Sequence, residues 1–376
     1  MRVGLLVSGH GFGHAVRSAT IGRELLARGH ELVVRTDAPA WLFPKEARLL
    51  PTRAWPFDMG VVQRDGLELD IDETRRRWIE FEAAFDERAD AEARELTEAG
   101  VEIALGDIPP LGFEAAARAG IPSLAMTNFG WDWIYAAWPG FDAPVRRVRS
   151  AYARAELLLR MDLHADGEDA FPAFRRIVDV PLVARPASAD AAAATRESLR
   201  LPHQVQPVLL SFGGIEVSRL DLAALGRWER YVFLTPSSTP ASDLPSNVRP
   251  LPRAGVDYAA LVAACDAVVT KPGYGIVADC LANRAPVLYT DRGPFREYPV
   301  LADALERLGP ARYVPSADVR RGWIGPHLDA LLSEAHQWQP LRLDGASAVA
   351  DELARFVRDR STSGRPPAVA VGTVNA

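Results

Sequence analysis

A glycine-containing turn with one lysine, Thr270-Lys271-Pro272-Gly273-Tyr274-Gly275, combines residue types that suit phosphate binding. The apolar run before it predicts a short buried strand, and the spacing of apolar residues over 276–283 predicts a helix. A turn from a strand into a helix presents backbone N–H groups and the positive end of the helix dipole to a ligand. Lys271 adds a mobile positive charge. We therefore expect a nucleotide-linked or otherwise phosphorylated small molecule at this turn.

A second glycine-rich turn, Gly9-His10-Gly11-Phe12-Gly13-His14, follows the apolar run at residues 3–8. It departs from the dinucleotide-binding pattern because His14 stands where the third glycine should be, and no Gly-Lys-Ser/Thr follows as in a Walker A loop. Asp37, at the end of the second predicted strand, keeps a dehydrogenase open as an alternative. Histidine titrates near neutral pH, so we expect His14 to act as a general base, with His10 and Arg17 near the ligand. A tight turn whose glycines only permit close packing is the competing interpretation.

Strand and helix signals alternate along the first half of the chain and restart at residues 207–211, which lead into Phe212-Gly213-Gly214. This alternation predicts an α/β protein with parallel sheets, built as two Rossmann-like domains that face each other across a cleft. Ligands in such sheets bind beyond the carboxyl ends of the strands, so we expect the site in the cleft. The predicted organisation is an N-terminal acceptor-side domain (1–185), a linker (186–206), a C-terminal donor domain (207–345), a closing helix (346–360) and a disordered tail (361–376).

Further candidates come from polar or aromatic residues next to predicted strands. Gly213 and Gly214 could approach a diphosphate together with the Lys271 turn, Asp279 could accept hydrogen bonds from a ribose, and Arg296-Glu297 could contact a sugar. Asp107 ends a strand and could orient a histidine across the cleft. Asn128, Trp131 and Asp132 lie in an aromatic segment that suits either stacking on an acceptor or ordinary core packing.

Composition excludes several classes of protein. The net charge of −6 over 376 residues argues against a nucleic-acid partner, and no apolar run approaches the roughly 20 residues needed to span a bilayer. Cys265 and Cys280 are expected as buried thiols, which predicts a cytoplasmic protein. The basic runs at 75–77 and 146–149 leave peripheral contact with a membrane open, although solvated helix faces are favoured. Asp70-Ile71-Asp72 has the spacing of a metal chelator but is interpreted as solvated charge, so no metal is expected.

These motifs together resemble those of the GT-B glycosyltransferases, including the GlcNAc transferase that forms lipid II. A closer resemblance is to the amino-terminal region of the L-arabinokinases. It rests on 8–14 (SGHGFGH), 127–132 (TNFGWD), 179–183 (DVPLV) and 271–275 (KPGYG). The sugar-kinase module of those enzymes has no counterpart here, so kinase activity is not carried over. Asp279 stands where related enzymes usually have Glu, which weakens the ribose contact.

The resemblance implies a metal-independent transferase that moves a sugar from a nucleotide diphosphate donor, UDP above all, to a small-molecule or lipid-linked acceptor, with no cofactor. His14 and Asp107 would be catalytic. The predicted donor-binding residues are Gly213, Gly214, Lys271, Gly273, Tyr274, Gly275, Asp279, Arg296 and Glu297. The predicted acceptor-side residues are His10, Gly11, Phe12, Gly13, Arg17, Asn128, Trp131 and Asp132. A nucleotide-sugar hydrolase and a non-catalytic nucleotide-sugar sensor remain the alternatives.

Overall fold

The computed structural model describes residues 1–202, 204–213, 217, 220–236, 239–251, 256–335 and 337–362. The chain divides into two compact units. The N-terminal unit contains residues 1–62, 71–183 and the described part of the chain from residue 344 onward. The C-terminal unit contains Gln63–Asp70 and Ala184–Leu343. A short segment of the N-terminal half of the sequence therefore belongs to the C-terminal unit, which the sequence did not predict.

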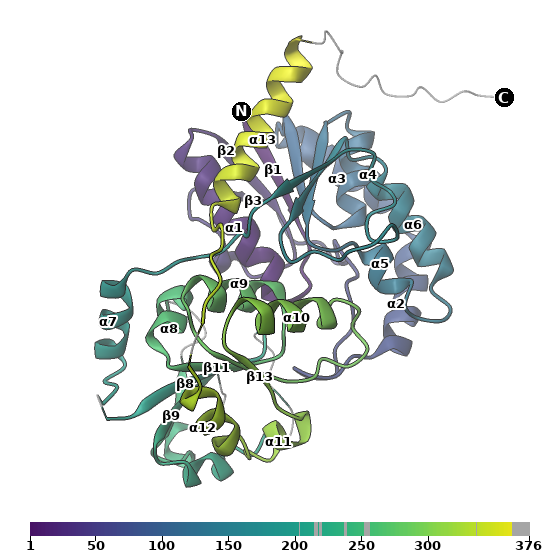
Figure 1. Ribbon diagram of the computed structural model, residues 1–376. Helices are drawn as coiled ribbons and strands as arrows, with labels where there is room; N and C mark the ends of the chain where they lie inside the picture. Colours follow the sequence, from purple (N-terminus) through teal and green to yellow (C-terminus); the bar gives the residue numbers. More distant parts are fainter. Residues whose placement is uncertain are drawn as a thin grey trace, which may run out of the picture. The chain divides into compact units, whose positions relative to one another are not determined.

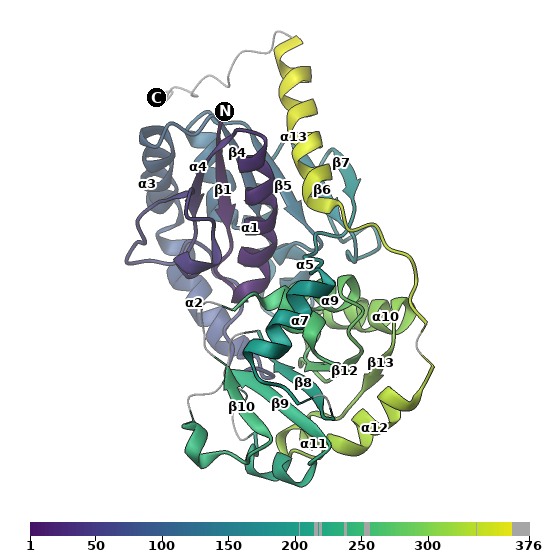
Figure 2. The same ribbon diagram turned by 90° about the vertical axis from the view of Figure 1, so that its left-hand side faces the viewer.

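The N-terminal unit is built on a seven-stranded parallel sheet in the order β3-β2-β1-β4-β5-β6-β7. Its strands are β1 (Arg2–Val7), β2 (Glu31–Arg35), β3 (Arg48–Leu49), β4 (Ile103–Asp107), β5 (Ser123–Thr127), β6 (Leu157–Met161) and β7 (Ile177–Val180). Its helices are α1 (Gly11–Ala27), the 3-10 helix η1 (Ala40–Leu42), α2 (Ile71–Ala83), α3 (Phe85–Glu98), α4 (Pro110–Arg118), α5 (Trp131–Tyr135), α6 (Asp142–Tyr152) and α13 (Gly345–Thr362). Helices α1 and α13 lie on one face of the sheet and α3 and α4 on the other (Figure 1 and Figure 2).

The C-terminal unit has a six-stranded parallel sheet in the order β10-β9-β8-β11-β12-β13. Its strands are β8 (Gln206–Ser211), β9 (Tyr231–Pro236), β10 (Val248–Leu251), β11 (Ala267–Thr270), β12 (Val287–Tyr289) and β13 (Ala311–Tyr313). Its helices are α7 (Ala189–Ser198), η2 (Ala223–Arg227), η3 (Ala241–Asp243), α8 (Tyr258–Ala264), α9 (Tyr274–Ala282), α10 (Tyr298–Leu308), α11 (Ser316–Arg320) and α12 (Gly325–Ser333). Helices α8, α9 and α10 cover one face, and α11 and α12 cover the other (Figure 1).

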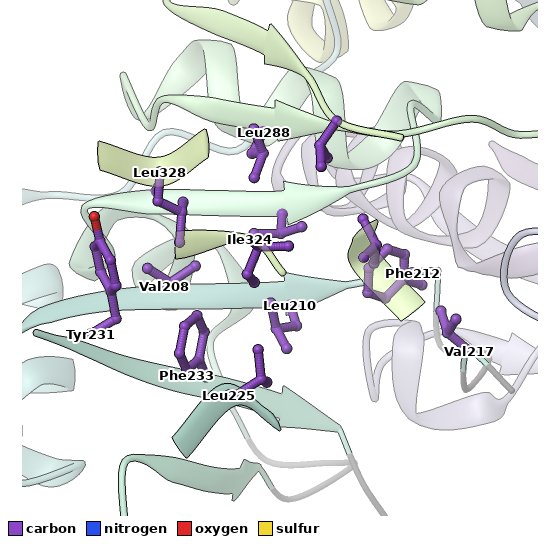
Figure 3. Close-up of a cluster of buried hydrophobic side chains, with 14 of the residues drawn as sticks. Val208, Leu210, Phe212, Val217, Leu225, Tyr231, Phe233, Leu288, Ile324 and Leu328 are labelled. Atoms are coloured by element: carbon purple, nitrogen blue, oxygen red, sulfur yellow. The ribbon is translucent and has the colours of Figure 1, made fainter. Parts of the chain in front are cut away.

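The core of the C-terminal unit shows why these runs form strands buried on both faces. Val208 and Leu210 of β8 point to the same side, as residues two apart in a strand must, and pack with Phe233 of β9 (Figure 3). Ile324 and Leu328, which flank and enter α12, close this layer. All of these side chains are almost fully buried. The near-continuous apolar runs seen in the sequence are those of central parallel strands.

Three sequence-based assignments change in the structure or lie outside it. The predicted linker contains helix α7, whose first turn is capped by the Ser188 hydroxyl accepting from the Ala191 N–H at 3.1 Å. The Asp70-Ile71-Asp72 motif, interpreted from the sequence as solvated charge, includes the start of helix α2 at Ile71. Gly214 and residues 363–376 of the predicted tail lie outside the described residues, whereas 361 and 362 belong to α13.

Both cysteines, Cys265 and Cys280, are buried free thiols, as predicted. Within the described residues, no helix is long and apolar enough to cross a membrane.

Candidate functional site

Sheet topology brings the first glycine-rich turn next to the end of β4. Strands β1 and β4 are hydrogen-bonded neighbours, with Val7 opposite Asp107. The order of the sheet reverses at this pair, and such a reversal is where parallel sheets bind their ligands. The chain leaves β1 and enters α1 through Gly11, whose φ of +68° is readily reached by glycine. His14, in the first turns of α1, therefore lies above the end of β4.

Asp107 is the centre of a buried polar network in the N-terminal unit. Its Oδ1 lies 2.9 Å from Nδ1 of His14, and Arg17 donates to both of its oxygens, from Nη2 at 2.6 Å and from Nε at 2.7 Å. Ser18 donates to Oδ2 at 3.1 Å, and Arg17 also donates to Oδ1 of Asn128 at 2.6 Å. The expectation that Asp107 orients a histidine across the cleft is wrong for His14, because both residues belong to the same unit.

The charges in this network fix the tautomer of His14. Burial alone would raise the pKa of Asp107, but the positive charge of Arg17 and the contact with His14 outweigh it and hold the pKa at about 2. An ionised carboxylate only accepts hydrogen bonds, so Nδ1 of His14 must carry the proton that faces Asp107. Nη2 of Arg17 also lies 3.0 Å from Nδ1 of His14. With a proton on Nδ1 both atoms are donors, so they do not bond to each other and both donate to Oδ1 of Asp107. Nε2 of His14 is left with its lone pair, as a general base requires.

Arg17 and Asn128 are part of this network rather than exposed ligand-binding groups. Arg17 is 2% exposed and Asn128 is fully buried. The positive charge of Arg17 is already paired with Asp107, so its surroundings do not support the predicted direct contact of Arg17 with the acceptor.

A second buried carboxyl group, which the sequence did not single out, lies close to this network. Asp58 accepts from Nε1 of Trp131 at 2.9 Å, while its Oδ1 is buried and has no hydrogen-bond partner among the described residues. Burial raises the pKa of Asp58 to about 6, although the hydrogen bonds with Ser8 and Trp131 lower it, as would a positive charge on His14. The sequence does not mark Asp58 as a site residue, because the loop around it has no helix or strand spacing of apolar residues.

The aromatic segment packs as core. Trp131 is fully buried, with its ring 5.9 Å from that of His14 and 5.1 Å from that of His10. Asp132 is also buried and accepts from Nε of Arg149 at 3.1 Å. The burial of Trp131 and Asp132 fits ordinary core packing, one of the two interpretations of this segment.

The remaining residues of the first turn are less enclosed. Nδ1 of His10 accepts from the Val61 N–H at 3.2 Å. This contact needs glycine at position 60, because an added Cβ would lie 2.8 Å from the His10 ring. Phe12 is half-buried and makes an edge contact with Trp41 at 5.6 Å; Trp41 is 52% exposed and was missed in the sequence. Gly11 and Gly13 are partly exposed beside them.

The Lys271 turn is built by the equivalent reversal in the C-terminal sheet. Strands β8 and β11 are neighbours, with Ser211 opposite Thr270, so the turns that follow them meet. Gly213, at φ +75°, lies beside Lys271, since a Cβ added there would be 3.8 Å from Cε of the lysine. Gly273 is the N-cap of α9, and Tyr274 and Gly275 are the first two residues of that helix. The first turn contains no acidic residue, and no side chain caps it. This helix end suits an anion.

Lys271 itself is only 7% exposed. Its Nζ donates to Oε1 of Gln63 at 2.8 Å. Burial and, to a lesser extent, the positive charge of Arg292 lower the pKa of Lys271 to about 7, while Asp65 acts in the opposite direction. The amine is therefore poised to gain a full positive charge when an anion approaches.

Two predicted donor residues, Asp279 and Glu297, pair with arginines of the C-terminal unit. Asp279 is 2% exposed and forms an ion pair with Arg185, so a ribose would have to compete with that arginine. Glu297 is buried and accepts from Nη1 of Arg292 at 2.7 Å, so contact between Glu297 and a sugar is not supported. Arg296 is partly exposed.

A cavity of about 430 Å³ opens in the same unit. It is lined by Leu67, Glu68, Asp291, Arg292, Gly293, Tyr298, Ser316 and Arg320. Asp291 and Tyr298 flank the predicted pair Arg296-Glu297 but were not themselves assigned from the sequence to a sugar.

The described residues contain no group of three or more metal-ligating side chains. At the Asp-x-Asp motif, Asp70 pairs with Arg64, and Asp72 pairs with Arg75.

No protein-family model matches the chain. The chain is 32% identical over 337 residues to L-arabinokinase of Arabidopsis thaliana, an alignment that covers 87% of this chain and 32% of the relative. The chain thus spans about a third of the length of that relative. This alignment confirms the predicted resemblance to the L-arabinokinases.

Solved structures identify the fold. The glycosyltransferase of kitacinnamycin superposes with a TM-score of 0.57 at 18% identity, over 96% of this chain and 95% of that one. UGT89C1 of Arabidopsis thaliana, solved with UDP, gives 0.56 at 15% identity, over 94% and 99%. MurG of Acinetobacter baumannii gives 0.52 at 15% identity, again over 94% and 99%. The chain has the GT-B glycosyltransferase fold, as predicted.

Proposed function

We propose that this protein is a glycosyltransferase that moves a sugar from a nucleotide diphosphate donor to an acceptor hydroxyl, with His14 as the general base. The observation that carries the proposal is the pair of His14 and Asp107, in which an ionised, buried carboxylate holds the proton on Nδ1 and leaves Nε2 as the base. The GT-B fold and the UDP found with UGT89C1 support a nucleotide-sugar donor.

In the proposed reaction, Nε2 of His14 takes the proton of the acceptor hydroxyl as its oxygen bonds to the anomeric carbon. The bond from that carbon to the diphosphate breaks, and its electron pair leaves on the phosphate oxygen. The leaving group carries the growing negative charge. Lys271, Gly213 and the start of α9 at Gly273 would stabilise that charge electrostatically.

The test replaces His14 with Ala and measures two quantities. UDP release from UDP-sugars over a panel of acceptor alcohols should fall by about 10²–10⁴-fold, the usual contribution of a general base. The rise in melting temperature caused by the same donor should persist, because donor binding is assigned to other residues. His30→Ala, at the opposite end of α1, is the matched control and should keep wild-type turnover.

Three results would contradict this proposal. Wild-type turnover in His14→Ala would remove the base assignment. Release of free sugar at full rate without any added acceptor would identify a nucleotide-sugar hydrolase. Donor binding with no turnover over the whole acceptor panel would identify a sensor.

A further inference from the structure

Residues Gln63–Asp70, here called the strap, come from the N-terminal half of the sequence but fold as part of the C-terminal unit. Gln63 and Leu69 form an isolated antiparallel bridge, so the strap turns back on itself. Leu67, near its tip, is 4% exposed and belongs to the hydrophobic cluster of the C-terminal sheet. The strap is thus anchored in the core rather than lying loosely on the surface.

Two charged residues of the strap hold its shape and fix it to α11. Oδ1 of Asp65 accepts from the N–H groups of Leu67 at 2.7 Å and Glu68 at 2.9 Å, which closes a tight turn. Its Oδ2 accepts from Nη1 of Arg320 at 2.8 Å, and Glu68 accepts from Nη2 of the same arginine at 2.8 Å. Asp65 is 5% exposed, so this ion pair is shielded from solvent.

The anchored turn places Gln63 next to Lys271, the lysine of the predicted phosphate site. Oε1 of Gln63 accepts from Nζ of Lys271 at 2.8 Å. A neutral amide oxygen is a weaker partner for an ammonium group than a phosphate oxygen, because only the phosphate adds charge to the hydrogen bond. Gln63 therefore satisfies the buried amine without neutralising it.

We propose that the strap is a latch on the donor site, in which the amide oxygen of Gln63 competes with a diphosphate oxygen for Nζ of Lys271. The inference rests on the proposed function, which assigns the donor diphosphate to Lys271. Binding of a diphosphate exchanges the Gln63 contact for a charged one. Only the Gln63 side chain needs to change its contact, because Leu67 and Asp65 keep the strap anchored.

The decisive measurement is the Kd of UDP and of inorganic pyrophosphate for the full chain by calorimetry. Gln63→Ala removes the competing oxygen and should lower both Kd values by about 3- to 10-fold, the net worth of a typical hydrogen bond. Gln63→Glu places a carboxylate against Lys271 and should raise them by at least about 10-fold. Gln337→Ala, an exposed glutamine of the same unit, is the matched control and should leave them unchanged.

A further variant, Lys271→Met, separates failure of the latch from failure of the proposed donor site. If Lys271→Met loses UDP affinity while Gln63→Ala binds as wild type or more weakly, the latch is wrong and the donor site stands. If Lys271→Met binds UDP as tightly as wild type, the donor site is wrong and the latch falls with it. Absence of binding of either ligand to every variant overturns both.

Discussion

The pKa of Lys271 predicts how donor affinity should depend on pH. Burial, followed by the charge of Arg292, lowers this pKa to about 7. Between pH 6.5 and pH 8.5 the charged fraction of such an amine falls from about three quarters to about 3%. If the diphosphate binds only the ammonium form, the Kd should rise by about 25-fold over this interval.

UDP-glucose is the suitable probe, because its diphosphate is esterified at both ends and does not itself titrate in this interval. Calorimetric Kd values at pH 6.5, 7.5 and 8.5 should follow the titration of Lys271 in the wild type. His14→Ala should show the same dependence, because the proposal assigns donor binding to other residues. Lys271→Met should bind weakly and without this dependence.

A wild-type Kd that stays constant from pH 6.5 to 8.5 would refute the reasoning, as would the same slope in Lys271→Met. Either result would mean that the lysine ammonium does not bind the diphosphate. The assignment of the donor to this turn would then have to be abandoned.

Two predictions concern stability, measured by urea unfolding. Asp107→Asn should lower the free energy of unfolding at pH 7 by about 3–5 kcal/mol, because Arg17 would keep a buried charge without its partner; Asp351→Asn, at an exposed pair with Arg28, should cost less than about 1 kcal/mol, and equal losses would contradict the argument. Asp58, with its raised pKa of about 6, is protonated in the folded chain and ionised in the unfolded chain between about pH 4 and pH 6, so its contribution to stability falls as the pH rises through that interval. Asp58→Asn removes this loss, so the free energy of unfolding of the variant minus that of wild type should be larger at pH 7.5 than at pH 4, by up to about 3 kcal/mol. The same difference at both pH values would show that ionisation of Asp58 does not destabilise the folded chain.

Local sequence signals predicted most of the fold. Apolar runs predict strands at 31–35, 123–126 and 267–269. Strand β2 (Glu31–Arg35) has these limits and β5 and β11 extend one residue beyond them, because apolar runs bounded by polar or glycine-rich turns mark the central strands of a parallel sheet. Helix α7 was missed because its alanine-rich sequence, mostly exposed, has no apolar stripe for a pattern to reveal. The two glycine-rich turns were also located correctly between a strand and a helix: the first follows β1 and the Lys271 turn follows β11.

The roles of individual side chains were decided by tertiary contacts. The sequence made Arg17, Trp131 and Glu297 candidates for ligand contacts, but all three side chains are buried. Arg17 and Glu297 also form ion pairs, with Asp107 and Arg292. Conversely, nothing local to Asp58 marks it, because its pKa depends on how completely the surrounding chain excludes water.

The sequence by itself determined the alternation of strands and helices, the two glycine-rich turns and the presence of a histidine in one and a lysine in the other, because these depend on neighbours a few residues away. Only the tertiary structure decided that Asp107 orients His14, that Arg185 holds Asp279, and that Gln63 reaches Lys271 from 208 residues away. Such contacts depend on strand order and on burial, and both are set by the packing of the whole unit rather than by any local pattern.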